Sequence, residues 1–342
     1  MNILLIGGTN FIGPSVIRHL INMGHDVTVF HRGKTKAEFP DAVNHIFGDR
    51  SNLKSFKSEF EKLSPTVVVD MIAYTEEDAT TTMNTFKGIA QRVVTISSID
   101  VYRAYGVILG RESDVVSVPL TEDSPLRSSY YPFRDMPQRP LNAPTDYEKI
   151  FVEKVVMSEP ELPGTIIRLP MVYGYKDPLN RFQPYLQRMD DKRPAIILEE
   201  SIAKWRGSYG YVENIGFAIA LAATNEKAKG RIYHVAEEKT LSESDRITKI
   251  AELVGWEGNL IFLSQKELPA DWKLMLNTQQ EWFVDSTRIR QELGYQEIVP
   301  LNEALYETVK YLRQHSPIPS QNNSAPWLLE YKTEDEICMA LS

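Results

Sequence analysis

Tyr147 and Lys149, in the stretch TDYEKIF (145–151), could move a proton to or from a substrate oxygen. A phenol hydroxyl gives or takes the proton, and a nearby ammonium group lowers the pKa of the phenol. On a helix, two such side chains share a face when they are four residues apart, but the fourth position after Tyr147 is Phe151. Lys149 follows after only two residues, which places it roughly 200° around a helix from Tyr147. The pair is therefore either a displaced proton-transfer site or the remnant of one.

A second stretch with chemical potential is ILLIGGTNFIG (3–13), which joins a buried apolar run to an amphipathic segment. Gly7 permits a tight turn, and Gly13 lets a helix pack closely on a sheet. The N-terminus of that helix can bind a pyrophosphate. Because the glycines lie at the first strand–helix junction of an alternating chain, the stretch predicts a dinucleotide-binding loop rather than a structural glycine turn.

Strands and helices alternate over the first 100 residues, and they must position both stretches. Short apolar runs predict buried parallel strands at 2–6, 26–30, 45–47, 67–71 and 92–96. Apolar residues three or four apart predict helices at 11–23, 51–63 and 77–90. This order is typical of an α/β fold with a Rossmann-like, doubly wound parallel sheet and right-handed crossovers.

The rest of the chain begins with a long polar loop over 104–144. Thr145 and Glu148 have the spacing of a capping box, which predicts a helix from Asp146 to Val156. Strands are predicted at 165–169 and near 194–198, 208–211 and 231–235, with helices near 212–224, 242–254, 286–293 and 301–312.

These elements divide into two domains and a tail. We expect a nucleotide-binding Rossmann domain over 1–174, to which segments near 205–240 return, and a smaller mixed α/β substrate domain over 175–315. The tail, 316–342, either docks on the body, docks on a second subunit in a homodimer, or is loose.

Composition and charge exclude several classes of protein. Acidic residues outnumber basic residues 46 to 38, and the resulting net charge of −8 argues against a general nucleic-acid binder. Cys338 is the only cysteine and the six histidines lack ligand-like spacing, so neither a disulfide nor a metal site is expected. The start, MNILLIGG, is unlike a signal peptide, and no run reaches the ~18 apolar residues of a membrane span. We expect a cytoplasmic protein that binds a small-molecule substrate and no membrane.

The glycine loop resembles that of the extended short-chain dehydrogenase/reductases, the NAD-dependent epimerase/dehydratase family, whose fingerprint has glycines spaced as positions 7, 10 and 13. Position 10 is Asn, which tolerates left-handed backbone better than other non-glycine residues. The GGT-x-FIG form is similar to an atypical branch that includes nucleotide-sugar epimerase-like proteins and chloroplast stem-loop RNA-binding proteins. The stretches GDRSN (48–52), VVVDMIAY (67–74), TISSIDVY (95–102) and RLPMVYG (168–174) resemble further family landmarks, and the likeness covers residues 1–314.

The resemblance implies a nicotinamide cofactor at the carboxyl ends of the strands. The loop would hold its pyrophosphate, Asp49 would bind its adenine, and later strand ends would line its nicotinamide. The residues implied in cofactor binding are Gly7, Thr9, Asn10, Phe11, Ile12, Gly13, Arg32, Asp49, Arg50, Ala73, Ser97 and Pro170.

The end of the second strand indicates which cofactor is preferred. NAD enzymes usually place an acid there on the ribose 2′-hydroxyl, but this chain reads His31-Arg32-Gly33-Lys34. An arginine attracts a 2′-phosphate through bidentate, charge-assisted bonds. We therefore expect NADP(H), with NAD(H) as the alternative.

For catalysis, the resemblance implies that Ser98 binds the substrate oxygen, Tyr147 transfers the proton and Lys149 holds the ribose. Ser98 could instead be a strand-end serine that bonds backbone. Tyr147 could sit before the first helical turn, with Lys149 in the lysine's place, or its role could pass to Tyr130 or Tyr131. In the remaining alternative, catalysis is lost and Tyr147 only begins a helix.

Other polar residues complete the implied site. Asp100 stands where the family's dehydratases carry an acid, and it either removes a proton next to a transient ketone or caps the following turn. Asp70 is a buried-strand acid that needs a partner, which the sequence does not identify. Asn180, Arg181 and Arg206 lie where the resemblance suggests contacts to the diphosphate of a nucleotide-sugar, and each also fits an ordinary surface position.

These assignments favour an NADP(H)-dependent epimerase, dehydratase or oxidoreductase that acts on a nucleotide-sugar or a similar hydroxylated substrate. One alternative is a catalytically impaired cofactor-binding protein that contacts RNA or a protein partner. Another is an NADP-dependent reductase of small aromatic or carbonyl metabolites. Whether the chain is an enzyme depends on the Tyr147–Lys149 pair.

Overall fold

The computed structural model describes residues 1–35, 39–136, 139–140, 143–272, 274, 276–315 and 331–341. Its main sheet has seven strands in the order β10-β6-β5-β4-β1-β2-β3, and every pairing is parallel. The strands are β1 (Asn2–Ile6), β2 (Asp26–His31), β3 (Asn44–Phe47), β4 (Val67–Asp70), β5 (Arg92–Ser98), β6 (Gly164–Leu169) and β10 (Arg231–His234). The expected Rossmann-like, doubly wound sheet is confirmed.

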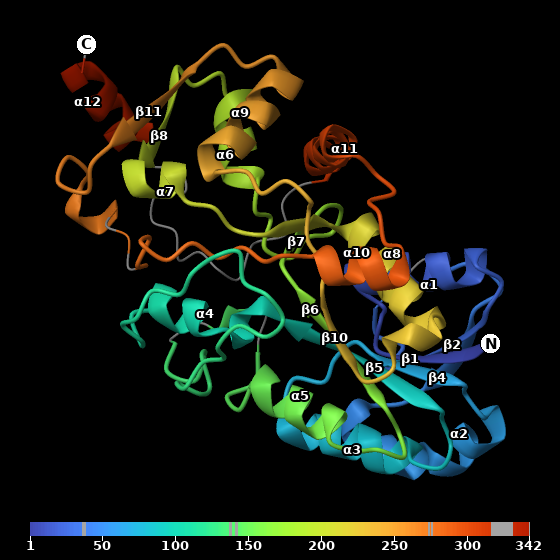
Figure 1. Cartoon of the computed structure of the whole chain (residues 1–342). Helices are drawn as coiled ribbons and strands as arrows, with labels where there is room; N and C mark the ends of the chain where they lie inside the picture. Colours follow the sequence, from blue (N-terminus) through green and yellow to red (C-terminus); the bar gives the residue numbers. More distant parts are fainter. Residues whose placement is uncertain are drawn as a thin grey trace.

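Helices cover both faces of this sheet (Figure 1). The helices α1 (Ile12–Asn22) and α8 (Val212–Thr224) pack on one face, and α2 (Lys57–Leu63), α3 (Glu76–Phe86) and α5 (Lys149–Met157) pack on the other. Successive strand side chains point to opposite faces, so Ile3 and Leu5 join one core cluster while Leu4 and Ile6 join the other. This double burial explains why the strands read as continuous apolar runs.

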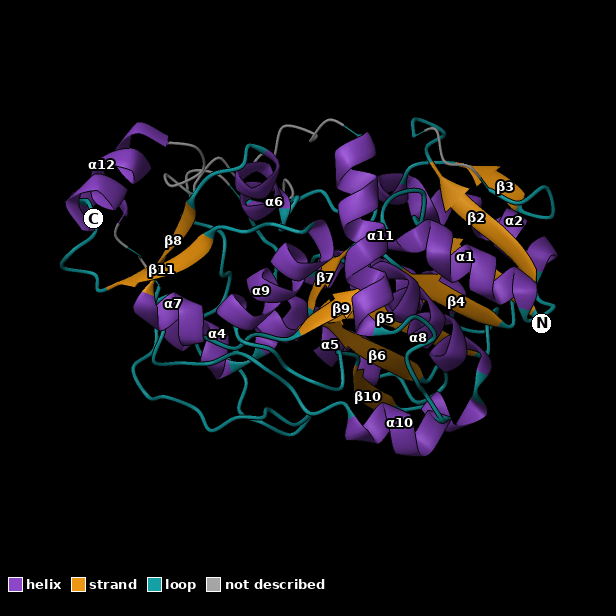
Figure 2. Cartoon of the chain, turned by 90° about the horizontal axis from the view of Figure 1, so that it is seen from above, coloured by secondary structure: helices purple, strands orange, loops and turns teal. Residues whose placement is uncertain are grey.

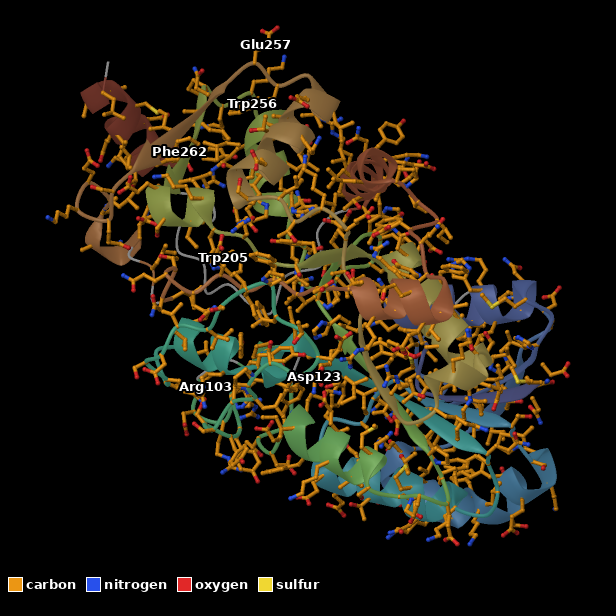
Figure 3. The ribbon with its side chains drawn as sticks, viewed as in Figure 1. Arg103, Asp123, Trp205, Trp256, Glu257 and Phe262 are labelled. Atoms are coloured by element: carbon orange, nitrogen blue, oxygen red, sulfur yellow. The ribbon has the colours of Figure 1, made fainter. Side chains whose placement is uncertain are left out.

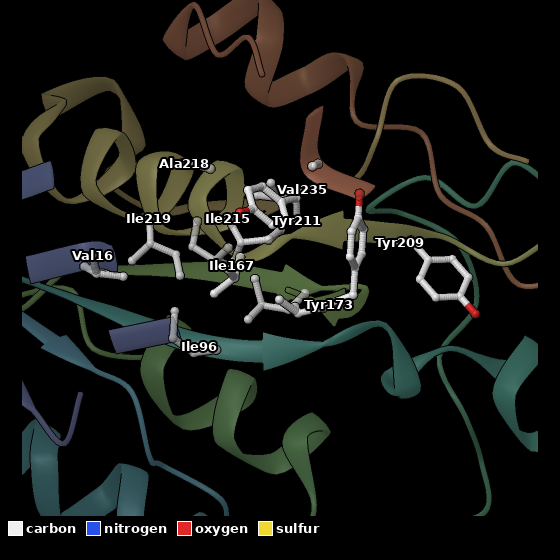
Figure 4. Packing of buried hydrophobic residues seen from close by; sticks show 14 of the residues in the cluster. Val16, Ile96, Ile167, Tyr173, Tyr209, Tyr211, Ile215, Ala218, Ile219 and Val235 are labelled. Carbon is white, nitrogen blue, oxygen red and sulfur yellow. The ribbon is translucent and has the colours of Figure 1, made fainter. Parts of the chain in front are cut away.

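Close packing joins the first helix to the sheet and to α8. Figure 4 shows Val16 of α1 and Ile215 and Ile219 of α8 beside Ile96 and Ile167 of the sheet. The N-terminus of α1 is therefore held firmly at the carboxyl end of β1.

A smaller group of helices and strands lies beyond the main sheet, on the side where the carboxyl end of β5 leads into α4 (Arg103–Ile108) (Figures 1 and 2). It contains the parallel pair β8 (Ala195–Glu199) and β11 (Asn259–Leu263), with α6 (Gln183–Asp190), α7 (Glu200–Lys204), α9 (Glu243–Val254) and α12 (Tyr331–Leu341). A second parallel pair, β7 (Met171–Tyr173) and β9 (Tyr209–Tyr211), continues from the main sheet toward it. The remaining helices are α10 (Thr287–Leu293) and α11 (Leu301–Gln314). Figure 3 shows Trp256 and Phe262 on this smaller group, on the far side of it from the main sheet.

Three local expectations differ from the structure. The capping box at Thr145 and Glu148 is wrong, because α5 begins at Lys149 and Glu148 itself is the N-cap, accepting a hydrogen bond from the Ile150 N–H. The segment predicted as one helix over 51–63 is a 3₁₀ helix, Arg50–Phe56, followed by α2. The segment predicted as a loop over 104–144 begins with α4, and the elements β7, α6, α7, β11 and α12 were not predicted either.

Part of the tail docks on the body, while residues 316–330 lie outside the described residues. In α12, Glu334 is 2% exposed and accepts a hydrogen bond from Arg188 Nε at 2.6 Å. Asp335 pairs with Arg193, and the guanidinium of Arg193 lies 4.4 Å from the ring centre of Tyr331. These contacts fix α12 against the end of α6.

Across the described ranges, none of the helices combines the length and the apolar character needed to cross a bilayer.

Candidate active site

The glycine loop between β1 and α1 forms the tight turn that the sequence predicts, with one correction. Gly7 and Gly8 have φ angles of 84° and 85°, in the left-handed region that favours glycine. The third left-handed residue of the turn is Phe11, at 46°, and not Asn10. Asn10 supports the turn through its side chain instead, whose Oδ1 accepts a hydrogen bond from the Phe11 N–H at 3.0 Å.

The start of α1 fits an anion. A Cβ on Gly13 would lie 2.2 Å from the Cα and carbonyl oxygen of Gly8, so the helix approaches the loop too closely for any side chain. The first turn of α1 has no acidic residue, and no side chain in the described part of the protein caps it. The positive end of the helix dipole therefore favours a phosphate. The turn formed by Thr9, Asn10, Phe11 and Ile12 therefore fits a pyrophosphate.

Arg32 and Asp49 follow the carboxyl ends of β2 and β3, and Arg32 is exposed. The carboxylate of Asp49 accepts hydrogen bonds from the N–H and the hydroxyl of Ser51, both at 3.0 Å. These bonds, together with the positive charges of Arg32 and Lys34, lower the pKa of Asp49. Asp49 is thus an ionised acceptor close enough to Arg32 for their charges to interact, and the role of the two residues at the adenosine stays a prediction.

Arg50 has a structural role that the resemblance did not imply. Its guanidinium donates to both carboxylate oxygens of Asp70, at 2.6 and 2.9 Å, and to Asp78 at 2.8 Å. Asp70 is fully buried, so the pair neutralises a charge that water cannot reach. Arg50 is therefore the partner of Asp70 that the sequence did not identify, and its contact to a cofactor stays a prediction.

Lys149 is the first residue of α5 and is 3% exposed. Its Nζ donates to the carbonyl oxygens of Ala73, at 2.6 Å, and Ile96, at 2.8 Å, which follow β4 and lie in β5. Burial lowers the pKa of Lys149 to about 8, against the raising effect of Asp100 and Asp70. An ammonium has three donors, so within the described part of the chain one is left for a ligand.

Phe151 occupies the position four residues after Tyr147, and its ring points elsewhere. It packs on Tyr130, with ring centres 4.8 Å apart, and on Tyr131, at 6.0 Å. The two loop tyrosines therefore cover Phe151. The arrangement in which Tyr147 precedes the helix and Lys149 reaches the strand ends is the one present in the structure.

Tyr147 lies two residues before α5 and is 8% exposed. Its hydroxyl donates to Asp100 Oδ2 at 2.8 Å, and Lys149 Nζ lies 5.8 Å from the centre of its ring. Burial and then the negative charge of Asp100 raise the pKa of Tyr147 well above its ordinary value. Tyr147 is therefore a protonated acid in the ligand-free protein and not a phenolate.

Ser98 ends β5 and caps the short 3₁₀ helix Ile99–Val101, because its Oγ accepts the Asp100 N–H at 3.1 Å. The expectation that Asp100 caps this turn is wrong, since Ser98 does so. The Ser98 hydroxyl keeps its own proton, so it can bond the backbone and still donate to a substrate oxygen. The carboxyl ends of β4 and β5 thus bring together the four candidate catalytic residues, Ser98, Asp100, Tyr147 and Lys149.

Two neighbouring residues that the resemblance implied in cofactor binding are buried. The Ser97 hydroxyl donates to Glu153 Oε1 at 2.5 Å and points into the interior, so only its backbone lies at the strand end. Pro170 directly follows β6, beside Gly210 of β9. Contacts from either residue to a cofactor stay a prediction.

A buried ion pair that the sequence analysis missed holds these residues in place. Arg127 donates to Glu148 at 2.9 and 3.3 Å, and Glu148 is fully buried between Tyr147 and Lys149 in the sequence. Arg127 Nε also donates to the carbonyl oxygen of Asp100 at 2.5 Å. The signal available in the sequence was an acid flanked by the two candidate residues, but its partner is 21 residues away in a loop.

The predicted substrate residues have internal partners. Arg181 donates to the Val172 carbonyl at 2.6 Å and to Asp177 at 2.7 Å, while Asn180 is 9% exposed. Arg206 pairs with Glu281 at 2.6 Å. Contacts from these residues to a diphosphate stay a prediction.

A tyrosine cluster that was not foreseen lies on β7 and β9, where Figure 4 labels Tyr173 and Tyr209. Tyr173 donates to Glu237 at 2.7 Å, and the guanidinium of Arg246 lies 4.0 Å from the ring centre of Tyr209. No group of three or more metal-ligating side chains occurs among the described residues.

Comparisons with known proteins agree with the fold. The family model described as "NAD dependent epimerase/dehydratase family" matches residues 3–236. Among curated proteins, a 2′-dehydrokanamycin reductase from Streptomyces kanamyceticus is 22% identical over 84% of this chain and 75% of its own length. A chloroplast stem-loop binding protein of 41 kDa from Arabidopsis thaliana is 24% identical over 90% of this chain and 78% of its own.

Solved structures share the fold. A UDP-glucose 4-epimerase from Thermotoga maritima, solved with UDP-glucose, has a TM-score of 0.66 at 16% identity, covering 92% of this chain and 99% of its own. A dTDP-glucose 4,6-dehydratase from Bacillus anthracis, solved with NAD, has a TM-score of 0.67 at 14% identity, covering 92% and 97%.

Proposed function

The chain belongs to the NAD dependent epimerase/dehydratase family, and on that premise we propose that it is an NADP(H)-dependent enzyme of epimerase, dehydratase or oxidoreductase type. Its substrate is a nucleotide-sugar or a similar hydroxylated compound. The family supports a nicotinamide cofactor. The preference for NADP(H) rests on exposed Arg32 at the end of β2, where an acid is absent.

The observation that carries the proposal is the position of Lys149. Although it is only two residues from Tyr147, its Nζ reaches the carbonyl oxygens of Ala73 and Ile96 at the strand ends. The sequence spacing had left a lost catalyst open as an explanation, and this geometry supports a working one.

Each side chain has a defined task in the proposed reaction. The Ser98 hydroxyl donates to the reacting oxygen of the substrate, and the remaining donor of Lys149 binds a ribose hydroxyl of the cofactor. Tyr147, which is protonated at rest, gives its proton to a ketone oxygen in the reductive direction. When bound, the nicotinamide supplies the hydride donor or acceptor.

The test uses purified protein with NADP(H) and three probes: UDP-glucose, dTDP-glucose and 2′-dehydrokanamycin. We expect one of them to change the absorbance of the reduced cofactor, and Tyr147→Phe to lower that rate by about 100-fold. Tyr130→Phe, which alters a half-exposed tyrosine that packs on Phe151, is the matched control and keeps the wild-type rate. Undiminished turnover in Tyr147→Phe contradicts the assignment.

A second candidate function, RNA binding by a protein that only holds the cofactor, is supported by the likeness to the chloroplast stem-loop binding protein. The net charge of −8 opposes it, because RNA affinity depends on phosphate neutralisation. Salt-dependent retention of a stem-loop RNA together with no cofactor turnover would favour this function over the first.

A further inference from the structure

Asp100 is a buried acid whose carboxylate has an unusual set of contacts. The residue is 4% exposed, and Oδ2 accepts the Tyr147 hydroxyl at 2.8 Å. Oδ1 has no hydrogen-bond partner among the described residues. The nearby guanidinium of Arg127 donates to the backbone oxygen of Asp100 and not to its carboxylate. Among the described residues, the hydroxyl of Tyr147 is therefore the one hydrogen-bonding partner of the Asp100 carboxylate.

A buried carboxylate with one neutral donor can take up a proton at low cost. Burial raises the pKa of Asp100, while the charge of Arg127 and the Tyr147 hydrogen bond lower it. The ionisable groups that interact with Asp100 are Arg127, Tyr147, Glu148 and Lys149, and, from α4, Tyr105. The combination suits a group that changes its protonation state during a reaction.

We propose that Asp100 is the proton acceptor of Tyr147, so that the two side chains form a relay. In the oxidative direction, the substrate hydroxyl proton moves to the Tyr147 oxygen as the Tyr147 proton moves to Asp100 Oδ2. The carbinol C–H bond breaks, a C=O bond forms, and the hydride is accepted by the oxidised nicotinamide cofactor. In the reductive direction, the protons return along the same path. The inference rests on the proposed function and adds the destination of the proton.

The relay explains how the tyrosine can work without a lysine four residues later. In the usual arrangement a nearby ammonium makes the phenol more acidic. Here Asp100 Oδ2 lies 2.8 Å from the phenol oxygen and takes up the proton, so a phenolate need not persist. Lys149 still supplies a positive charge that favours ionised Asp100, since its ammonium lowers the pKa of that carboxyl.

The Arg127–Glu148 pair sets the geometry of the relay. Glu148 accepts hydrogen bonds from Arg127, from the Tyr131 N–H at 2.7 Å and from the Ile150 N–H at 3.0 Å. It therefore fixes the backbone between Tyr147 and Lys149, while Arg127 fixes that of Asp100. Both are positioning residues, because neither donates to the carboxylate of Asp100.

The first arm of the test needs no substrate. Infrared difference spectroscopy follows the carboxyl stretch of Asp100 during a pH titration of the NADP⁺ complex, with Asp100→Asn to assign the band. Tyr147→Phe removes a hydrogen bond that favours the carboxylate, so the Asp100 transition moves to higher pH. An unchanged transition overturns the relay, whatever the enzyme turns over.

The second arm measures hydride transfer from UDP-glucose to NADP⁺ over a range of pH. We expect Asp100→Asn to slow it by about 100-fold and to remove the rise in rate with pH that ionisation of Asp100 produces in the wild type. A purely structural role would lower the rate equally at every pH. Asp114→Asn, at an exposed loop acid, is the matched control and keeps the wild-type profile.

The two arms separate the inference from the proposed function. If the wild type transfers no hydride to or from any of the three probes but the infrared transition moves, the proposed function fails and the Tyr147–Asp100 pair stands. If hydride transfer occurs and Asp100→Asn keeps the wild-type rate, the relay fails and the proposed function stands.

Discussion

Replacing Lys149 with methionine tests the central feature of the site, a charged side chain held in the interior. Lys149 is 3% exposed, and its ammonium contacts two carbonyl oxygens but no carboxylate in the described structure. Burial lowers its pKa from 10.5 to about 8. Methionine has a similar length and no charge, so the variant removes the ionisable group while largely filling its space.

The size of the effect follows from the pKa difference. Each pKa unit corresponds to about 1.4 kcal/mol, so the charged side chain costs the folded protein about 3 kcal/mol. The folded pKa is below the unfolded one, so between pH 8 and 10.5 the unfolded chain binds more protons and stability rises with pH. The cost is therefore absent above about pH 10.5, where the amine is neutral in both states, and it is complete below about pH 8, where the amine is charged in both states.

Urea unfolding of the cofactor-free protein at a series of pH values measures this contribution. The stability of Lys149→Met relative to wild type should be greater by about 3 kcal/mol at pH 7 than at pH 10.5. Comparing the two proteins cancels the titration of the buried tyrosines, which both share. Lys54→Met, at an exposed lysine, is the control and should show the same difference from wild type at both pH values. A pH-independent difference for Lys149→Met would refute the buried, weakly basic lysine.

Three further predictions concern other parts of the fold. Gly13→Ala should weaken NADP⁺ binding by about 10- to 100-fold in calorimetry, because the new Cβ meets backbone. Gly24→Ala, beyond the other end of α1, meets nothing within 4 Å but has a φ of 82°, so it should lower stability and keep the affinity of the folded protein; equal affinities of the two variants would contradict the close approach. Arg92→Met should lower the free energy of unfolding by about 3 kcal/mol in urea, because the buried guanidinium donates to three carbonyl oxygens at the end of α8; a loss below about 1 kcal/mol would contradict it. Glu334→Ala should cost about 3 kcal/mol in the same assay and speed limited proteolysis of the tail, because it leaves the Arg188 charge buried without its carboxylate; unchanged proteolysis would show that this pair does not hold α12.

Much of the main sheet was predictable because its strands are buried on both faces. Runs such as VVVDM and RVVTI are continuous and apolar, and the glycine loop follows the first of the strands. The later helices 212–224, 242–254 and 286–293 were also found, within one residue at each end. Periodicity carries this information because one helix face or both strand faces meet the core.

Pairings between distant residues were not predictable. The sequence identified Asp70 as a buried acid, but its partner Arg50 was assigned to the cofactor, because a motif does not show which way a side chain turns. The helix start near residue 146 was misplaced for a similar reason. Glu148 was predicted to be the second member of a capping box. In the fold it is buried in an ion pair with Arg127 of the long loop, and it is the N-cap of α5.

The strand β11 and the helix α12 were missed because neither has a strong pattern. Residues of β11 are partly exposed, so the strand does not form a continuous buried run. The helix α12 is held mainly by charged residues, among them Glu334. Ion pairs with distant arginines leave no periodic apolar signal in the sequence.

Calorimetric titration of ligand-stripped protein with NADP⁺ and with NAD⁺ tests the central claim most directly, namely that the glycine loop and Arg32 bind a phosphorylated nicotinamide dinucleotide. We predict that NADP⁺ binds at least about 10-fold more tightly than NAD⁺, and that Arg32→Ala removes the difference without abolishing binding of either. An absence of binding heat from both cofactors would contradict the account.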